Sequence, residues 1–151
     1  MPSTPCPVRQ AAAIPIRSGQ VCLVLSSNGR RWVVPKGCIE PGQTAGGTAL
    51  QEAWEEAGLV GVLRSEPVGS YLYEKVGNCH YVTVFLLHVT EVRDDWPEKA
   101  WRTRLWLSPK QALARLEERG LRKLIRRLLV RDAAGRPPEN LIPADSFPDP
   151  S

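Results

Sequence analysis

Three glutamates on one predicted helix have the residue type and spacing for metal chemistry. Glu52, Glu55 and Glu56 are spaced i, i+3 and i+4, so they gather on one side of a helix. Like charges at that spacing repel by roughly 0.2–0.5 kcal/mol per pair, and the last turns of a helix disfavour anions. A divalent cation would relieve both effects, because clustered carboxylates bind hard cations such as Mg²⁺ or Mn²⁺.

The segment before this helix decides how the glutamates are interpreted. An acidic helix face alone is most often simply solvated, but this one follows a loop rich in Gly and Pro, residues 35–42. Such a loop can bring backbone groups close to a phosphate and its metal. Loop and helix together resemble the Nudix box, G-x5-E-x7-R-E-U-x-E-E-x-G-U, where U is aliphatic. The positions that match are Gly37, Glu52, Ala53, Glu55, Glu56, Gly58 and Leu59.

Two positions depart from the box. Gln43 stands where the family has Glu, and Gln51 stands where it has Arg. The two losses are opposite in charge, so the net charge of the box is unchanged. We therefore hypothesise that a neutral amide contact between Gln43 and Gln51 replaces an ion pair between the loop and the helix.

The resemblance implies a metal site and a general base. One or more Mg²⁺ (or Mn²⁺) ions would be held by the carbonyl of Gly37 and the carboxylates of Glu52, Glu55 and Glu56. Glu52 and Glu56 are the expected catalytic residues, and Glu52 is the first choice as general base. A loop acid, Glu74 or Glu98, is left open for that role.

Beyond the box, residues 9–130 are similar to the branch that contains diphosphoinositol polyphosphate phosphohydrolases, whose members also cleave diadenosine polyphosphates. The similarity lies in residues 31–35, 89–96 and 104–106. It implies hydrolysis of phosphoanhydride bonds in a polyphosphorylated small molecule of either type. The substrate-binding residues expected from it and from the need for cations are Arg31, Lys36, Arg104, Arg30, Arg9 and His80.

Two alternatives stay open. The chain could be a pyrophosphatase for nucleoside triphosphates or nucleotide sugars, whose less anionic substrates need fewer basic residues around the pocket. It could also be a non-catalytic Nudix module that binds a ligand and regulates a partner. Gln43 and Gln51 favour that module, whereas the intact glutamates speak against it.

The elements that must position these residues alternate between strands and helices. Apolar and β-branched runs predict strands at residues 10–16, 21–25, 31–34, 60–63, 68–73, 81–92 and 103–107. Helices are predicted at residues 44–57, 108–118 and 121–131. We expect the α/β (α+β) class, with a mixed β-sheet between helices in a Nudix-like α/β/α sandwich.

The basic helix and the tail complete this picture. The apolar stripe of residues 121–131 predicts packing on the core, and polyanion binding by its basic face is secondary. We expect one domain at residues 1–132 and a Pro-rich tail at residues 133–151, poorly ordered or draped on the surface.

Composition sets the broad class. The chain has 151 residues, 42% of them hydrophobic, and a formal net charge of +4, which fits one globular domain with an anionic partner. Its four cysteines form no C-x-x-C pair, so neither zinc nor a disulfide framework is expected. Residues 1–9 have no apolar signal region and residues 82–89 are too short to cross a bilayer. We expect a cytoplasmic protein with neither a membrane nor a nucleic-acid partner, as a monomer or homodimer.

Overall fold

The structure, a computed structural model, describes residues 7–133, and within them one sheet of eight strands carries three helices. The strands are β1 (Val8–Arg17), β2 (Gln20–Leu25), β3 (Trp32–Val33), β4 (Lys36–Cys38), β5 (Leu59–Leu63), β6 (Gly69–Lys75), β7 (Asn78–Val92) and β8 (Arg104–Leu107). The helices are α1 (Ala45–Ala57), α2 (Pro109–Arg115) and α3 (Arg119–Ala133).

The sheet is mixed, and its order is β3-β2-β1-β7-β5. Its centre is a parallel pair between β1 and β7, which runs from Val8 opposite His80 to Ile16 opposite His88. All other strand pairs are antiparallel, with β4 on β1, β6 on β7 and β8 on β2. The long central strands therefore carry the short ones, including β4, which leads into the acidic helix.

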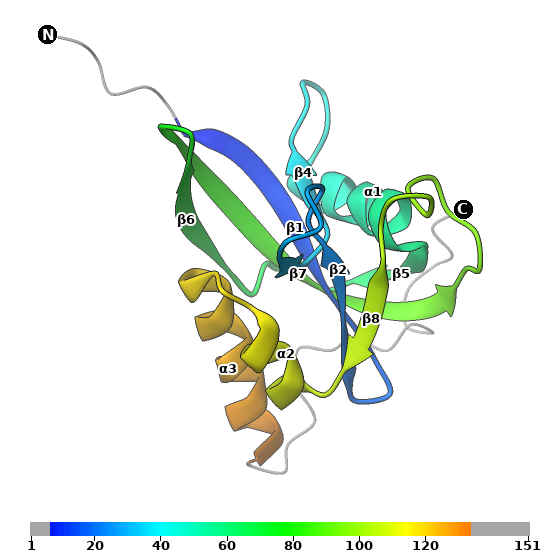
Figure 1. Cartoon of the computed structure of the whole chain (residues 1–151). Coiled ribbons are helices and arrows are strands. Elements are labelled where there is room, and N and C mark those ends of the chain that lie inside the picture. Colours follow the sequence, from blue (N-terminus) through cyan, green and yellow to red (C-terminus); the bar gives the residue numbers. More distant parts are fainter. Residues whose placement is uncertain (1–6, 134–151) are drawn as a thin grey trace, which may run out of the picture.

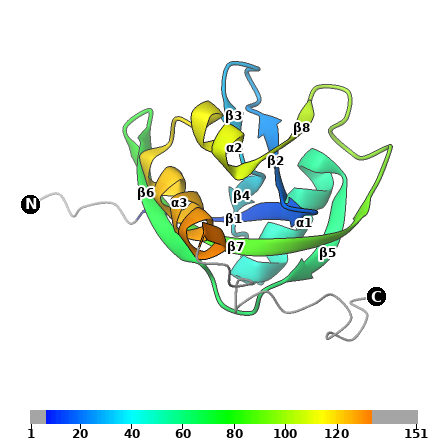
Figure 2. The same cartoon turned by 90° about the horizontal axis from the view of Figure 1, so that it is seen from below.

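Successive residues of β1 face opposite layers. Ala11 and Ala13 pack in the cluster that includes the buried alanines of α1, whereas Ala12 and Ile14 pack in the cluster that includes α2 and α3. Side chains alternate across a strand, so one strand serves two cores. Figures 1 and 2 show α1 on one side of the central strands and α2 with α3 on the other. The predicted sandwich with a mixed sheet is confirmed.

Helix α3 packs on the core as its apolar stripe predicted. Leu121, Leu124 and Ile125 are buried, and exposed basic side chains, Lys123, Arg126 and Arg127, lie off that stripe. Its hydrophobic stripe therefore serves packing, and its basic face is solvent-exposed.

Two predicted boundaries were wrong. The predicted loop at residues 35–42 contains β4, three residues that pair with β1 from Gln10 to Ala12. A strand this short that contains glycine has no apolar alternation to reveal it. The helix predicted to reach residue 118 ends at Arg115, because the chain turns extended at Leu116.

Most of the predicted tail lies outside the described residues. Among residues 7–133, no helix combines the length and the apolar character needed to cross a membrane.

Candidate active site

The acidic helix is held against the sheet by small side chains. Thr44 caps the N-terminus of α1, where its side chain accepts a hydrogen bond from the N–H of Gly47. Gly58 ends the helix in the left-handed conformation, with φ of 67°, which glycine adopts without steric cost. Ala49, Ala53 and Ala57 are fully buried, so α1 lies close to the sheet and its carboxylates lie beside β4.

Gly37 of β4 lies directly against the carboxylate of Glu52. A Cβ atom built on Gly37 would overlap the carboxylate oxygen Oε1 and the carboxyl carbon of Glu52. Any other residue at this position would have to displace that carboxylate. The first glycine of the box therefore leaves room for the carboxylate of the first glutamate.

Glu56 is buried and bound on both sides. The backbone N–H of Lys36 donates to its Oε2 at 3.2 Å, and Nη2 of Arg102 lies 3.2 Å from its Oε1. Burial, and then a hydrogen bond with Glu52, raises the pKa of Glu56, while Arg102 opposes the rise. Burial also raises the pKa of Glu52. In the absence of a cation, burial therefore favours a proton on this pair of carboxyl groups.

An amide chain holds the third glutamate. Nε2 of Gln43 donates to Oε1 of Gln51 at 2.9 Å, and Nε2 of Gln51 donates to Oε1 of Glu55 at 2.9 Å. Oε1 of Gln43 accepts from the hydroxyl of Thr48 at 3.3 Å. The predicted amide contact between Gln43 and Gln51 is confirmed, and it also fixes the carboxylate of Glu55.

The four groups expected to bind metal are thus placed in two sets. Glu52 and Glu56 adjoin Gly37 and Lys36, whereas the side chain of Glu55 is turned to Gln51. In the part of the chain that the structure describes, residues 7–133, no three side chains of His, Cys, Asp or Glu lie close enough together to hold a metal ion. Three carboxylates and a carbonyl are nevertheless the donors that a hard divalent cation prefers.

A loop after β7 supplies a second layer behind Glu56. The N–H of Glu98 donates to the carbonyl of Glu55 at 2.9 Å, which ties this loop to α1. Arg102 donates from Nε to Oε1 of Glu98 at 2.9 Å and from Nη1 to the carbonyl of Leu25 at 2.6 Å. Its remaining nitrogen faces Glu56. Glu98, one of the two loop acids left open, therefore lies within this network, whereas Glu74 lies on β6 opposite Cys79.

Two of the expected substrate-binding cations lie together. Arg31 and Lys36 line a small cavity of about 50 Å³ with Trp32, Tyr71 and Tyr73. Burial lowers the pKa of Lys36, and the neighbouring Glu56 opposes that shift. Arg31 is half-exposed and lies 3.9 Å from Glu117. Glu117 and Glu118 also line this cavity, so it joins charges of both signs to aromatic surface next to Lys36, whose N–H binds Glu56.

The other expected cations are placed differently. Arg104 donates from Nη1 to the carbonyl of Ala57 at 2.8 Å and lies over the ring of Trp96 at 4.1 Å. It therefore holds the C-terminal end of α1 and does not line this cavity. Arg30 is exposed in the turn after β2, where its N–H donates to Asn28, and Arg9 is exposed on β1.

A tyrosine that sequence reasoning missed links the remaining residues. The hydroxyl of Tyr73 donates to Oε1 of Gln10 at 2.7 Å and accepts from Nζ of Lys36 at 3.3 Å. The ring of His80 stacks on Tyr73, with centroids 4.6 Å apart. Gln10 and Tyr73 are 63 residues apart in the sequence, so only the pairing of β1 and β6 with β7 brings them together.

Comparison with known proteins assigns this part of the chain to a family. The family model of the NUDIX domain matches residues 7–128. The chain belongs to the Nudix family. Its fold agrees: the crystal structure of a C. elegans Ap4A hydrolase superposes with a TM-score of 0.68 at 20% identity, covering 83% of this chain and 98% of that one.

This Nudix chain is also similar in sequence to curated relatives. It is 40% identical over 103 residues to Nudix hydrolase 12, mitochondrial, of Arabidopsis thaliana, covering 62% of this chain and 50% of the relative. It is 36% identical over 115 residues to the human diphosphoinositol polyphosphate phosphohydrolase 2, covering 72% of this chain and 62% of the relative. The chain therefore spans between half and two thirds of the length of these relatives.

Proposed function

We propose that this chain is a metal-dependent hydrolase that cleaves phosphoanhydride bonds in a polyphosphorylated small molecule. The observation that carries the proposal is the pair of carboxyl groups against Gly37, in which Glu56 is buried and Glu52 is half-buried. Burying two carboxyl groups side by side costs free energy. Such a perturbed pair beside a cavity lined by charged and aromatic side chains is typical of a functional site.

The residues present fit a divalent cation. Gly37 leaves free the space that a side chain would take from Glu52, and the proton that burial favours on Glu52 and Glu56 could give way to a cation. Mg²⁺ or Mn²⁺ would be held by the carbonyl of Gly37 and the carboxylates of Glu52, Glu55 and Glu56. When bound, such an ion neutralises phosphate charge and lowers the pKa of an attacking water.

Glu52 is our choice for the general base. Its carboxylate is half-buried and burial raises its pKa. A raised pKa lies closer to neutral pH, where a general base accepts a proton most efficiently. Glu56 is bound by Arg102 and by the N–H of Lys36, so its expected role is to hold the metal and the neighbouring groups in position. The alternative is that Glu56 or Glu98 acts as the general base.

Lys36 and Arg31 would bind the substrate phosphates, and the ring of Tyr73 would contact the group attached to them. Phosphoryl transfer requires mainly positioning and charge neutralisation, which these two cations provide beside the carboxylates. A very anionic inositol pyrophosphate needs many cations, and Arg104 and Arg102 are engaged elsewhere. We therefore rank a diadenosine polyphosphate first and a diphosphoinositol polyphosphate second.

The test is turnover by the purified chain with Mg²⁺ or Mn²⁺. The substrates are diadenosine polyphosphates, an inositol pyrophosphate, nucleoside triphosphates, a nucleotide sugar and ADP-ribose. We expect metal-dependent phosphoanhydride cleavage that falls at least about 100-fold in Glu52→Gln and in Glu56→Gln. Glu66→Gln, which changes an exposed loop acid, is the matched control and should retain wild-type turnover.

The substrate assignment has a separate readout. Lys36→Gln should raise KM for the best substrate about tenfold or more, because a charged contact to phosphate is lost, while Lys75→Gln on the exposed end of β6 should not. Preferred cleavage of triphosphates would move the assignment to the nucleotide pyrophosphatase. Ligand binding without turnover on any substrate would support instead the non-catalytic module.

A further inference from the structure

A second cavity, away from the carboxylates, lies on the α3 side of the sheet. It has a volume of about 260 Å³, and it opens between the β1–β2 turn and the second half of α3. The carboxylate site adjoins β1 near Ala12, which pairs with Lys36, whereas the cavity wall begins at Ile16. Four residues of strand separate the two by roughly 13 Å.

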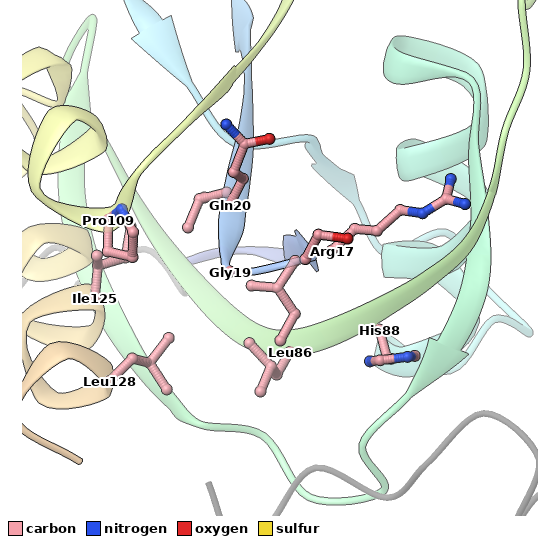
Figure 3. A pocket seen from close by; sticks show the side chains of 11 residues that line it. Arg17, Gly19, Gln20, Leu86, His88, Pro109, Ile125 and Leu128 are labelled. Carbon is pink, nitrogen blue, oxygen red and sulfur yellow. The ribbon is translucent and has the colours of Figure 1, made fainter. Parts of the chain in front are cut away.

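The cavity has an apolar floor and a polar rim. Figure 3 shows Leu128 reaching from α3 toward Leu86 of β7 and Ile125 beside Pro109, with Gln20 above them and Arg17 and His88 on the side away from α3. Ile125 and Leu86 are buried. A concave apolar surface of this kind gains free energy when another apolar group covers it.

The chain itself carries a matching segment immediately after α3. Leu128 lies five residues before the end of α3 at Ala133, which is roughly 7.5 Å along a helix. The sequence continues for 18 residues, and its large apolar side chains are Leu141, Ile142 and Phe147. The eight residue steps from Ala133 to Leu141 can span at most about 26–29 Å, so these side chains are within reach of the cavity.

The charges of the two parts are complementary. Residues 134–151 contain the acidic side chains Glu139, Asp145 and Asp149 against the single basic side chain of Arg136, a formal charge of −2. Arg17 lies on the rim of the cavity, and the exposed face of α3 carries Lys123, Arg126 and Arg127. An acidic segment with apolar anchors therefore complements an apolar cavity beside basic side chains.

We propose that the segment at residues 141–147 of this chain covers the cavity between α3 and the β1–β2 turn. Leu141, Ile142 and Phe147 supply the apolar contacts, and the acidic residues around them face Arg17 and the basic side of α3. The docking is intramolecular and stands apart from the hydrolase proposal, since none of these groups belongs to the carboxylate site.

The test uses the full chain and changes only the tail. Methyl groups of Ile16, Leu86, Ile125 and Leu128 would be followed by NMR in the wild type and in the variant Leu141→Ser, Ile142→Ser, Phe147→Ser. We expect shifts at these four residues, none at the methyls of Val24 and Leu87 on the α1 side, and a fall in Tm of about 3 °C. A variant with Ser146→Ala alone is the matched control and should leave the four resonances unchanged.

Two results would overturn the proposal. Resonances of the cavity that are identical in the wild type and the triple variant would show that residues 141–147 do not cover it. Shifts that vanish on dilution, together with a doubled mass at high concentration, would show that a second copy of the chain is the occupant. Because the substituted residues lie outside residues 7–133, the described domain keeps its own sequence, and unchanged methyl resonances of Val24 and Leu87 show that it stays folded.

Discussion

Nη2 of Arg102 lies 3.2 Å from Oε1 of Glu56, an ion pair between side chains that are only 13% and 4% exposed. The same guanidinium binds Glu98 and the carbonyl of Leu25, so one residue ties α1, β2 and the loop after β7 together. Removing Arg102 would leave the buried carboxyl group of Glu56, the carboxylate of Glu98 and the carbonyl of Leu25 without their common donor, which costs more than the contacts themselves contribute.

Arg102→Ala should therefore destabilise the protein. We expect the free energy of unfolding to fall by about 3–5 kcal/mol, measured by urea denaturation in the presence of a chelator. The control is Arg93→Ala, which removes a half-exposed pair with Glu91, where the loss should be at most about 1 kcal/mol. Equal losses of unfolding free energy in the two variants would show that the contacts of Arg102 contribute no more than an exposed ion pair does.

The carboxyl pair should give the metal-free protein a distinctive pH dependence. The pKa of Glu56 is raised from 4.5 to about 9 by burial and the hydrogen bond with Glu52. The folded state thus binds more protons than the unfolded state between these values, and this contribution to stability is lost as the pH rises. Chelator-treated wild type should lose stability relative to Glu56→Gln from pH 5 to pH 9.

Mg²⁺ should reverse that trend, because the cation requires the deprotonated carboxylates. The stabilisation is measured as the shift in Tm caused by about 10 mM Mg²⁺, a concentration that would occupy even a weak site. This shift should grow with pH in the wild type. The same shift should be small at every pH in Glu56→Gln. A stabilisation that is independent of pH would contradict cation binding at this pair.

Gly37→Ala should disturb the site through the contact of its new methyl group, because the backbone of Gly37 is not in a conformation that favours glycine. The new methyl group would overlap the Glu52 carboxylate, and a displacement of catalytic groups by about 1 Å can cost on the order of 100-fold in rate. Turnover and Mn²⁺ affinity should both fall. Gly46→Ala in α1, where the new methyl would meet Leu63 at an ordinary 3.5 Å, should preserve both.

The amide contact should be measurable as a coupling between Gln43 and Gln51. A double-mutant cycle with Gln43→Ala and Gln51→Ala should give a coupling of about 0.5–1.5 kcal/mol in unfolding free energy. Gln51→Arg alone should leave turnover within a few-fold, since Gln43 offers it no charge partner. A large gain in turnover from Gln51→Arg alone would refute the idea that the two glutamines compensate for each other.

Local patterns identified most of the fold. The 3.6-residue period of Ala49, Ala53 and Ala57 and the cap residues Thr44 and Gly58 locate α1 from the sequence alone. The spacing from Gly37 to Glu52 belongs to the box, but its cause, a carboxylate in the space of a missing side chain, required the packing of α1 on β4.

Long-range partners could not be inferred in the same way. Arg102 and Arg104 are only two residues apart, yet one faces Glu56 and the other faces Trp96 and Ala57. No local pattern separates them, because each partner comes from another element. The contact of Tyr73 with Gln10 has the same origin.

The alternation along β1 has a consequence for insertions and deletions. Ala11 and Ala13 face α1, while Ala12 and Ile14 face α3. Loss or gain of one residue here would push Ile14 or its neighbour into the tight space against α1 and shift Gly37 away from Glu52. The turn at Ser18 and Gly19 adjoins neither constraint. Length variation among homologous chains should therefore collect at that turn and be absent from residues 11–14.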